Sequence, residues 1–275
     1  MSRPVTHTQE SPIQRVRTRF RPRLDRLRNG CLDARIRYLT WRTCGRHYAA
    51  PISPTGLLAL EPSAITHALT QPWHETLTAD SPTHVQSITG GDWDREATPF
   101  TMHPVFRAHR EHAVGGVPWP ETMLGDAVAP SGAATRAAAS ASPLERVATD
   151  GGTDLGDSLE TCYADVAARG YRSVRERRRS RGRLETPTVF DPYPRLPPAK
   201  GEIRVCLGRD GRVVLQRGHH RLAIARLLDV ERVPVHVSVR HPQWQARRDR
   251  VVLTGSGTGD HPDLEDLEPR RTVSR

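Results

Sequence analysis

The residues best suited to chemistry lie in one run, 216–225, where a glycine turn leads into a short apolar helix. Gly218 opens this predicted helix, and the first turn carries His219, His220 and Arg221. Basic side chains at a free helix N-terminus cost roughly 0.3–1 kcal/mol each, because the helix dipole is positive there. A bound anion reverses this cost, since free backbone N–H groups and basic side chains then converge on it. The run therefore predicts a phosphate-binding site made by these four residues.

Strand-like segments surround the glycine turn. The expected elements are, in order, a strand at 202–207, a hairpin turn at 208–211, a strand at 212–215, the helix at 219–228 and a strand at 233–239. A helix that is apolar on most sides suits packing against a sheet. Because Gly218 has no side chain, it allows the backbone to approach a ligand closely.

This stretch resembles the ParB/sulfiredoxin-like superfamily. The resemblance depends on the run RDGRVVLQRGHHRLAIARLL and the closing strand VERVPVHV, and it covers only residues 200–240. It implies a nucleotide-binding α+β domain, since the glycine–basic helix start holds CTP in ParB proteins, ATP in sulfiredoxins and a nucleotide in related free-serine kinases. Gly218 matches the turn glycine, and His220 and Arg221 match the two basic positions beside the phosphates.

The chain departs from the members of this superfamily at several points. His219 occupies the position of the reactive cysteine of sulfiredoxins, so sulfinic-acid repair is not expected, and Cys206 is not a substitute. ParB proteins place two arginines after a glutamate, where this chain has His219 and His220. No helix-turn-helix follows, and no carboxylate cluster supports the metal-dependent nuclease activity often ascribed to such domains.

The expected ligand is therefore ATP or CTP, with or without Mg²⁺. Hydrolysis, phosphoryl transfer and a binding-driven conformational switch all stay open. Phosphoryl transfer would require a carboxylate near the γ-phosphate, and Glu202 is the candidate catalytic residue. Asp210 is more simply a hairpin residue.

No metal site is expected from the histidines. Neighbouring helix residues such as His219 and His220 point in different directions and rarely share a metal ion. His109 and His112 have a spacing compatible with ligation, but no third ligand is apparent. The aspartates of the turn at 92–94 could act in acid–base chemistry, although capping of nearby backbone is the simpler interpretation.

The net charge of +10 is concentrated near the N-terminus, because residues 1–50 hold twelve arginines against three acidic residues. An arginine-rich arm and the basic segment 169–183 support an alternative function, in which the protein binds DNA or another polyanion through 1–50 and 169–183. Such binding would weaken steeply with salt and would survive loss of Arg221. A third alternative is a scaffold that keeps the fold without the ligand.

Composition predicts a modest core, since only 36% of residues are hydrophobic and the chain has 23 prolines and 21 glycines. No apolar run reaches the ~18–20 residues that span a bilayer, and the four cysteines are scattered, so we expect a cytoplasmic protein without a transmembrane segment.

The fold class expected is α+β, with the ParB/sulfiredoxin-like ββαβ unit after an irregular N-terminal region. The predicted divisions are a basic arm at 1–30, an N-terminal region of unknown fold at 31–125, a flexible linker at 126–157, the ParB/sulfiredoxin-like domain at 158–253 and a disordered acidic tail at 254–275.

Overall fold

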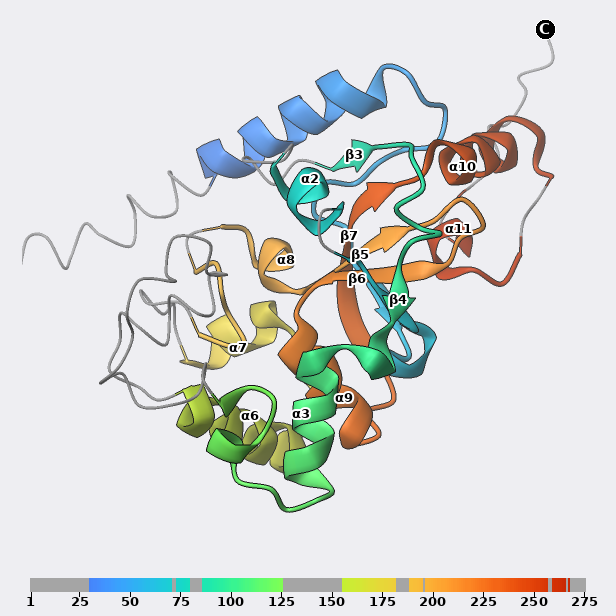
Figure 1. Cartoon of the computed structure of the whole chain (residues 1–275). Coiled ribbons are helices and arrows are strands. Elements are labelled where there is room, and N and C mark those ends of the chain that lie inside the picture. Colours follow the sequence, from blue (N-terminus) through green and yellow to red (C-terminus); the bar gives the residue numbers. More distant parts are fainter. Residues whose placement is uncertain are drawn as a thin grey trace, which may run out of the picture.

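The computed structural model describes residues 30–70, 73–79, 86–125, 155–181, 188–194, 196–256, 259–265 and 267. Within these residues seven strands form one mixed sheet, and helices cover both of its faces (Figure 1). The chain is therefore an α+β protein, as its sequence predicts.

The sheet has its central strands in the C-terminal half of the chain. Its order is β1 (Leu58–Leu60), β7 (Val233–Arg240), β5 (Ile203–Leu207), β6 (Val213–Arg217), β2 (His67–Ala68) and β4 (Thr98–Pro99), while β3 (Ser87–Ile88) also pairs with β7. β5 is antiparallel to β6 and parallel to β7. Every residue of β5 is buried, because this central strand is covered on both faces.

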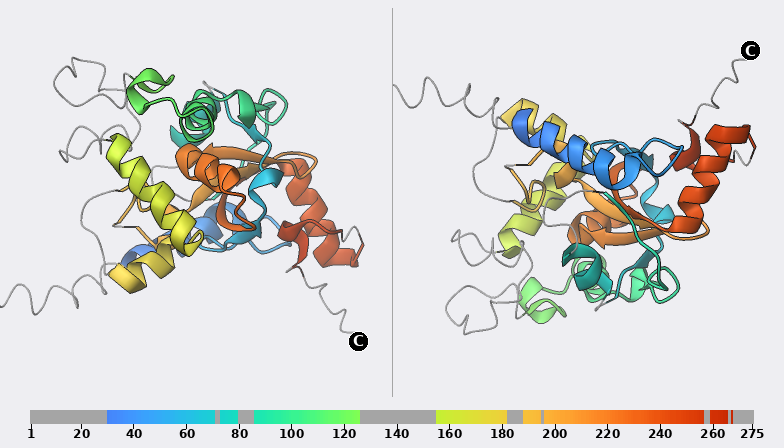
Figure 2. Two further views of the ribbon diagram at one scale, coloured as in Figure 1. Left: turned by 90° about the horizontal axis from the view of Figure 1, so that it is seen from below. Right: turned by 90° about the horizontal axis from the view of Figure 1, so that it is seen from above.

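One face of the sheet carries the helix that follows the glycine turn. It is covered by α9 (His219–Leu227), α3 (Pro104–Ala113) and α6 (Leu155–Arg169), as Figure 1 and the left view of Figure 2 show. Leu222 and Ala225 of α9 pack in a core cluster with Val205 and Leu207 of β5. Ile224 packs on the other side of α9, in a cluster with residues of α6.

The opposite face carries the N-terminal elements. A helix over 30–40, continued by the π-helical turn η1 (Trp41–Gly45), lies there with α2 (Trp73–Ala79), as the right view of Figure 2 shows. Leu77 of α2 packs in one cluster with Cys206 and Val214 of the sheet. Since Cys206 alternates with Val205 and Leu207 along β5, the two clusters lie on opposite faces.

Further helices lie around these layers. They are η2 (Pro62–Ala64), η3 (Phe100–Met102), η4 (Trp119–Glu121), α7 (Val174–Arg181), α8 (Pro198–Gly201), α10 (Pro242–Thr254) and α11 (Pro262–Glu265). α10 packs beside the β5–β6 hairpin, where the ring of Trp244 lies directly against Gly211. Gly211 has φ +92°, which suits glycine in this tight turn.

The strand–strand–helix–strand order predicted over 202–239 is present as β5, β6, α9 and β7. The regions predicted separately as 31–125 and 158–253 share one sheet, because β1 pairs with β7 and β2 pairs with β6. Pairing with long central strands explains how such short N-terminal strands are held.

Two predicted boundaries are wrong. The linker expected over 126–157 ends earlier, since α6 begins at Leu155; residues 126–154 lie outside the described residues. The tail expected to be disordered over 254–275 includes the end of α10 and the short helix α11. α11 is held because Asp263 is buried against two arginines and Leu264 enters the core. The predicted arm over 1–30 lies outside the described residues except for Gly30.

Candidate phosphate site at the start of α9

The glycine turn is built as the sequence predicts. β6 ends at Arg217, and Gly218 follows with φ 95° and ψ 31°, a left-handed conformation that favours glycine. A Cβ atom at this position would lie 3.2 Å from the Cα atom of Ile203, so a side chain would also crowd β5.

The N-terminus of α9 is left open by the described residues. None of their side chains caps the helix, and its first turn contains no acidic residue. Caps normally accept hydrogen bonds from the first N–H groups, which otherwise need water or a ligand. The start of α9 therefore presents backbone donors and positive potential together.

Arg221 lies beneath this turn. Its side chain is only 3% exposed, and its Nη1 donates a hydrogen bond of 2.6 Å to the carbonyl oxygen of Gly201. Nη2 would lie 3.3 Å from a Cβ atom at Gly218, while Nε has no hydrogen-bond partner among the described residues. Arg221 thus packs against the glycine turn from the buried side, and its Nε–H remains available to donate a hydrogen bond.

Glu202, the candidate catalytic residue, is also buried beside Arg221. One carboxyl oxygen accepts a 2.6 Å hydrogen bond from the backbone N–H of Val174, and the other has no partner among the described residues. Burial raises the pKa of Glu202 to about 7, against the opposing effect of the nearby Arg221 guanidinium. A carboxyl group with such a pKa can both accept and donate a proton near neutral pH.

Tyr171 and Arg177 extend this buried polar cluster. The hydroxyl of Tyr171 and the Nη2 of Arg177 lack hydrogen-bond partners among the described residues. Burial raises the pKa of Tyr171 to about 12, and Arg221, Glu202 and Arg177 all act on it electrostatically. Unpartnered buried polar atoms are uncommon and call for an explanation such as a ligand or ordered water.

The two histidines of the first turn face different neighbours. The ring of His219 stacks on His103, with ring centroids 4.4 Å apart and an interplanar angle of 14°. The Nδ1 of His220 lies 2.9 Å from the Nε2 of His109, whose Nδ1 lies 2.8 Å from the hydroxyl of Tyr163. The structure therefore surrounds the turn with aromatic side chains from η3, α3 and α6.

These imidazoles are neutral at physiological pH. Burial, reinforced by His103, holds the pKa of His219 well below its usual range. Burial and the same His103 lower the pKa of His220 to about 4. Burial also lowers the pKa of His109, to about 2.

The sequence-predicted residues Gly218, His219, His220 and Arg221 are thus together at the start of α9, with Glu202 behind them. Sequence reasoning missed their neighbours His103, His109 and Tyr163. The signal in the sequence is a row of histidines, His103, His109 and His112, on a helix that the sequence predicts at 102–113. Among the described residues, no three His, Cys, Asp or Glu side chains are arranged to hold a metal ion.

The turn at 92–94 has a structural arrangement. Asp94 is 4% exposed and accepts a 2.8 Å hydrogen bond from the backbone N–H of Arg209, and it also pairs with that arginine's guanidinium. Trp93 is fully buried, with its ring N–H donating to the carbonyl of Thr89 at 3.0 Å. These contacts join the turn to the β5–β6 hairpin.

Several arginines of the basic segment 169–183 are paired internally. Three of them converge on the buried carboxylate of Asp165, namely Arg169, Arg172 and Arg177. Arg178 pairs with the buried Asp191 at 2.7 Å. Of the described arginines on α7, Arg175 and Arg179 are exposed.

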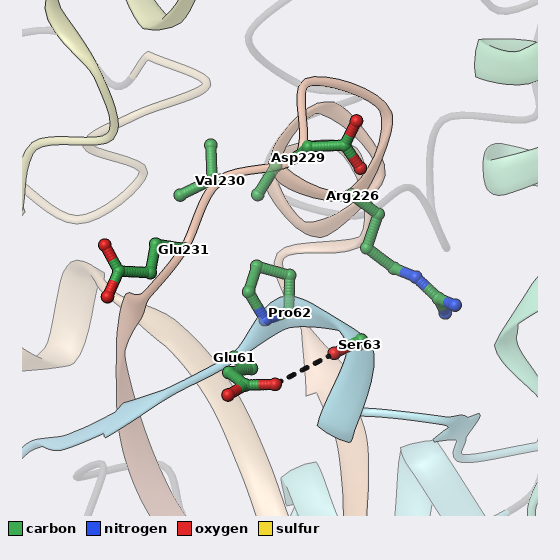
Figure 3. A pocket seen from close by; sticks show the side chains of 8 residues that line it. Glu61, Pro62, Ser63, Arg226, Asp229, Val230 and Glu231 are labelled. Carbon is green, nitrogen blue, oxygen red and sulfur yellow. Dashed lines mark hydrogen bonds between the residues drawn. The ribbon is translucent and has the colours of Figure 1, made fainter.

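A pocket of about 350 Å³ lies at the opposite end of α9 (Figure 3). Its lining residues are Glu61, Pro62, Ser63, Ala225, Arg226, Asp229, Val230 and Glu231. Figure 3 shows that the carboxylates of Glu61, Asp229 and Glu231 point in different directions. The charged groups of this pocket do not converge, and it is separate from the glycine turn.

Comparison with protein family models, with curated proteins and with solved structures finds no match. The resemblance over 200–240 therefore depends on the motif residues themselves. Within the described part of the chain, no helix is both long and apolar enough to cross a membrane.

Proposed function

We propose that this protein binds a nucleotide, ATP or CTP with or without Mg²⁺, and that its phosphates bind at the start of α9. The observation that supports this best is a helix N-terminus on a left-handed glycine that no described side chain caps, with two neutral histidines, one arginine and no acidic residue in its first turn. A phosphate there would accept hydrogen bonds from the free N–H groups and would benefit from the helix dipole.

The buried Arg221 is an independent observation in favour of an anion. Its side chain is 3% exposed, and the Nε has no partner among the described residues. A buried guanidinium that forms no ion pair with a described carboxylate is costly, and a nearby phosphate would compensate its charge. The resemblance to the ParB/sulfiredoxin-like superfamily agrees with this proposal but is limited to residues 200–240.

Glu202 is the residue to which we assign proton transfer, if the bound nucleotide reacts. Its unpartnered oxygen and its pKa of about 7 suit a general base or acid. Its position beside Arg221 puts it close to the proposed phosphate site.

Nucleic-acid binding through 1–50 and 169–183 is the second candidate function. The exposed Arg35, Arg37, Arg42 and Arg46 support it, as do Arg175 and Arg179 on α7. The internal pairing of Arg169, Arg172, Arg177 and Arg178 weakens it. Affinity for DNA that falls steeply with salt and is unaffected by changes at His219 would favour this second function over nucleotide binding.

The experiment that tests the first proposal is calorimetric titration of the full chain with ATP and with CTP, each with and without Mg²⁺. His219→Asp places a carboxylate in the first turn, and His219→Asn is its uncharged, nearly isosteric control. An aspartate there suits the helix dipole, so the variant should fold, but it should weaken phosphate binding by at least about 10-fold through charge repulsion. Micromolar binding that is lost in His219→Asp and kept in His219→Asn supports the site. Absence of binding by the wild-type protein, or equal binding by both variants, overturns it.

A further inference from the structure

A hydrogen-bonded chain of three side chains leads from α6 to the start of α9. It runs from the hydroxyl of Tyr163 on α6, through the ring of His109 on α3, to the Nδ1 of His220 on α9. The two distances are 2.8 and 2.9 Å, and the ring of His109 between them is fully buried. The other nitrogen of His220, Nε2, makes no hydrogen bond to a described residue.

A neutral imidazole carries one proton, so each ring in the chain donates through one nitrogen and accepts through the other. Two directions are therefore possible. Either the protons point from Tyr163 towards His220, which places a proton on the Nε2 of His220, or they point the opposite way, which leaves a lone pair there.

The setting favours the first direction. A phosphate at the start of α9 can only accept hydrogen bonds, so a lone pair on Nε2 would repel it and an N–H would bind it. In this direction the Tyr163 hydroxyl donates to the Nδ1 of His109; in the other direction its proton would need a second acceptor, and the described residues offer it none.

We infer that Tyr163 and His109 hold His220 in its neutral form with the proton on Nε2, so that this N–H donates to an unprotonated phosphate oxygen at the start of α9. This role of His220 rests on the proposed nucleotide site. Tyr163 and His109 are positioning residues, because they act on the ligand only through His220. The same type of neutral donor is known at helix N-termini, where the dipole disfavours the imidazolium form.

The surroundings of His220 disfavour a second proton. The charged or titratable groups that face it from the packed elements are His103 at the N-cap of α3, His109 on α3, Tyr163 on α6, and His219 and Arg221 on α9. None of them is a carboxylate that would stabilise an imidazolium ion. Binding through a neutral donor needs no protonated histidine, so affinity for ATP should stay level or rise between pH 5.5 and 7.5. A site that depended on imidazolium would instead lose affinity as the pH rises through this range.

The test that needs no ligand is long-range ¹H–¹⁵N correlation spectroscopy of the full chain labelled in histidine. His220→Gln and His109→Gln assign the two rings by loss of their signals. Between pH 6 and 8 we expect protonated Nε2 and unprotonated Nδ1 in both residues. A protonated Nδ1 on His220, or an imidazolium ion at pH 6, overturns the inference.

Tyr163→Phe removes only the hydroxyl group at the far end of the chain. We expect the Nδ1 resonance of His109 to shift, the signals of His220 to show a mixture of tautomers, and the affinity for ATP to fall about 2- to 10-fold, the range of one neutral hydrogen bond. His112→Gln is the control on α3, the helix of His109, because His112 pairs with Glu160 and is not part of the hydrogen-bonded chain. Unchanged tautomers in Tyr163→Phe overturn the positioning role. The expected tautomers in a protein that does not bind ATP would refute the proposed function while leaving the hydrogen-bonded chain in place.

Discussion

The buried carboxyl group of Glu202 gives a prediction that can be worked through in detail. In the folded chain its pKa is about 7, whereas its ordinary value is 4.5. Below pH 4.5 the group is protonated in both states and costs nothing. As the pH rises from 4.5 to 7, the unfolded chain releases this proton first, so the folded state loses stability, by up to about 3 kcal/mol above pH 7.

Glu202→Gln removes this dependence while keeping the size of the side chain and an oxygen for the N–H of Val174. We expect the free energy of unfolding of the variant to equal that of the wild type near pH 4.5 and to exceed it by up to about 3 kcal/mol at pH 8. Urea unfolding of the full chain across this range measures the difference, and the exposed Glu231 offers a control in Glu231→Gln, which should change little at any pH.

A loss of 2 kcal/mol or more in Glu202→Gln at pH 8 would refute this reasoning. It would mean that Glu202 is ionised and stabilised by Arg221, so that the carboxyl group could not serve as a proton acceptor with a pKa near 7.

Three further predictions concern other buried groups. Asp263→Asn should lower the free energy of unfolding by about 3–5 kcal/mol at pH 7, because two buried arginines lose their carboxylate. The loss should shrink in acid, since these arginines hold the pKa of Asp263 below its ordinary value. A change in urea midpoint that is independent of pH would contradict this. Burial lowers the pKa of the fully buried Lys200 to about 7, so the free energy of unfolding of the wild type should rise as the pH increases from 7 towards 10.5. Lys200→Met should remove this rise of a few kcal/mol. Parallel curves of unfolding free energy against pH for the two proteins would refute this. Gly211→Ala should destabilise the chain by about 2 kcal/mol or more, because a Cβ atom would lie 2.5 Å from the ring of Trp244 at a residue with φ +92°. A thermal midpoint within a degree of the wild type would refute this, because it would show that the hairpin turn has room for the alanine side chain.

The elements that could be predicted are those with local signals. The strands and helix over 202–239 are apolar runs separated by a Gly-Arg-Asp-Gly turn and by Gly218, and their order matches β5, β6, α9 and β7. The sequence also predicts helices at 102–113 and at 158–170, the second one ending at Gly170, and these correspond to α3 and α6 with ends that differ by a few residues. These segments carry their own periodicity or their own glycine stop.

The elements that escaped prediction depend on partners distant in the sequence. β2 and β4 have two residues each, too few to show a period, and they exist because β2 pairs with β6 and β4 with β2. The helix α11 lies in an acidic segment whose composition suggests disorder, and the pairing of Asp263 with Arg240 could not be inferred from spacing.

The same distinction applies to the site. Its four predicted residues are contiguous, so one motif was enough to find them. The placement of Arg221 beneath the turn depends on the carbonyl of Gly201, and the chain through His109 and Tyr163 depends on how α3 and α6 pack on α9. Such contacts between separate helices have no signature in a single sequence.

The measurement that tests the central claim most directly is the change in backbone amide shifts when ATP or CTP is added to the ¹⁵N-labelled protein. A phosphate at the start of α9 should move the amide signals of residues 218–221 most, because these N–H groups would donate to it. A phosphate site at the glycine turn would be contradicted if no amide signal moved. It would also be contradicted if the largest shifts lay around Asp229 at the other end of α9 or around the arginines of α7.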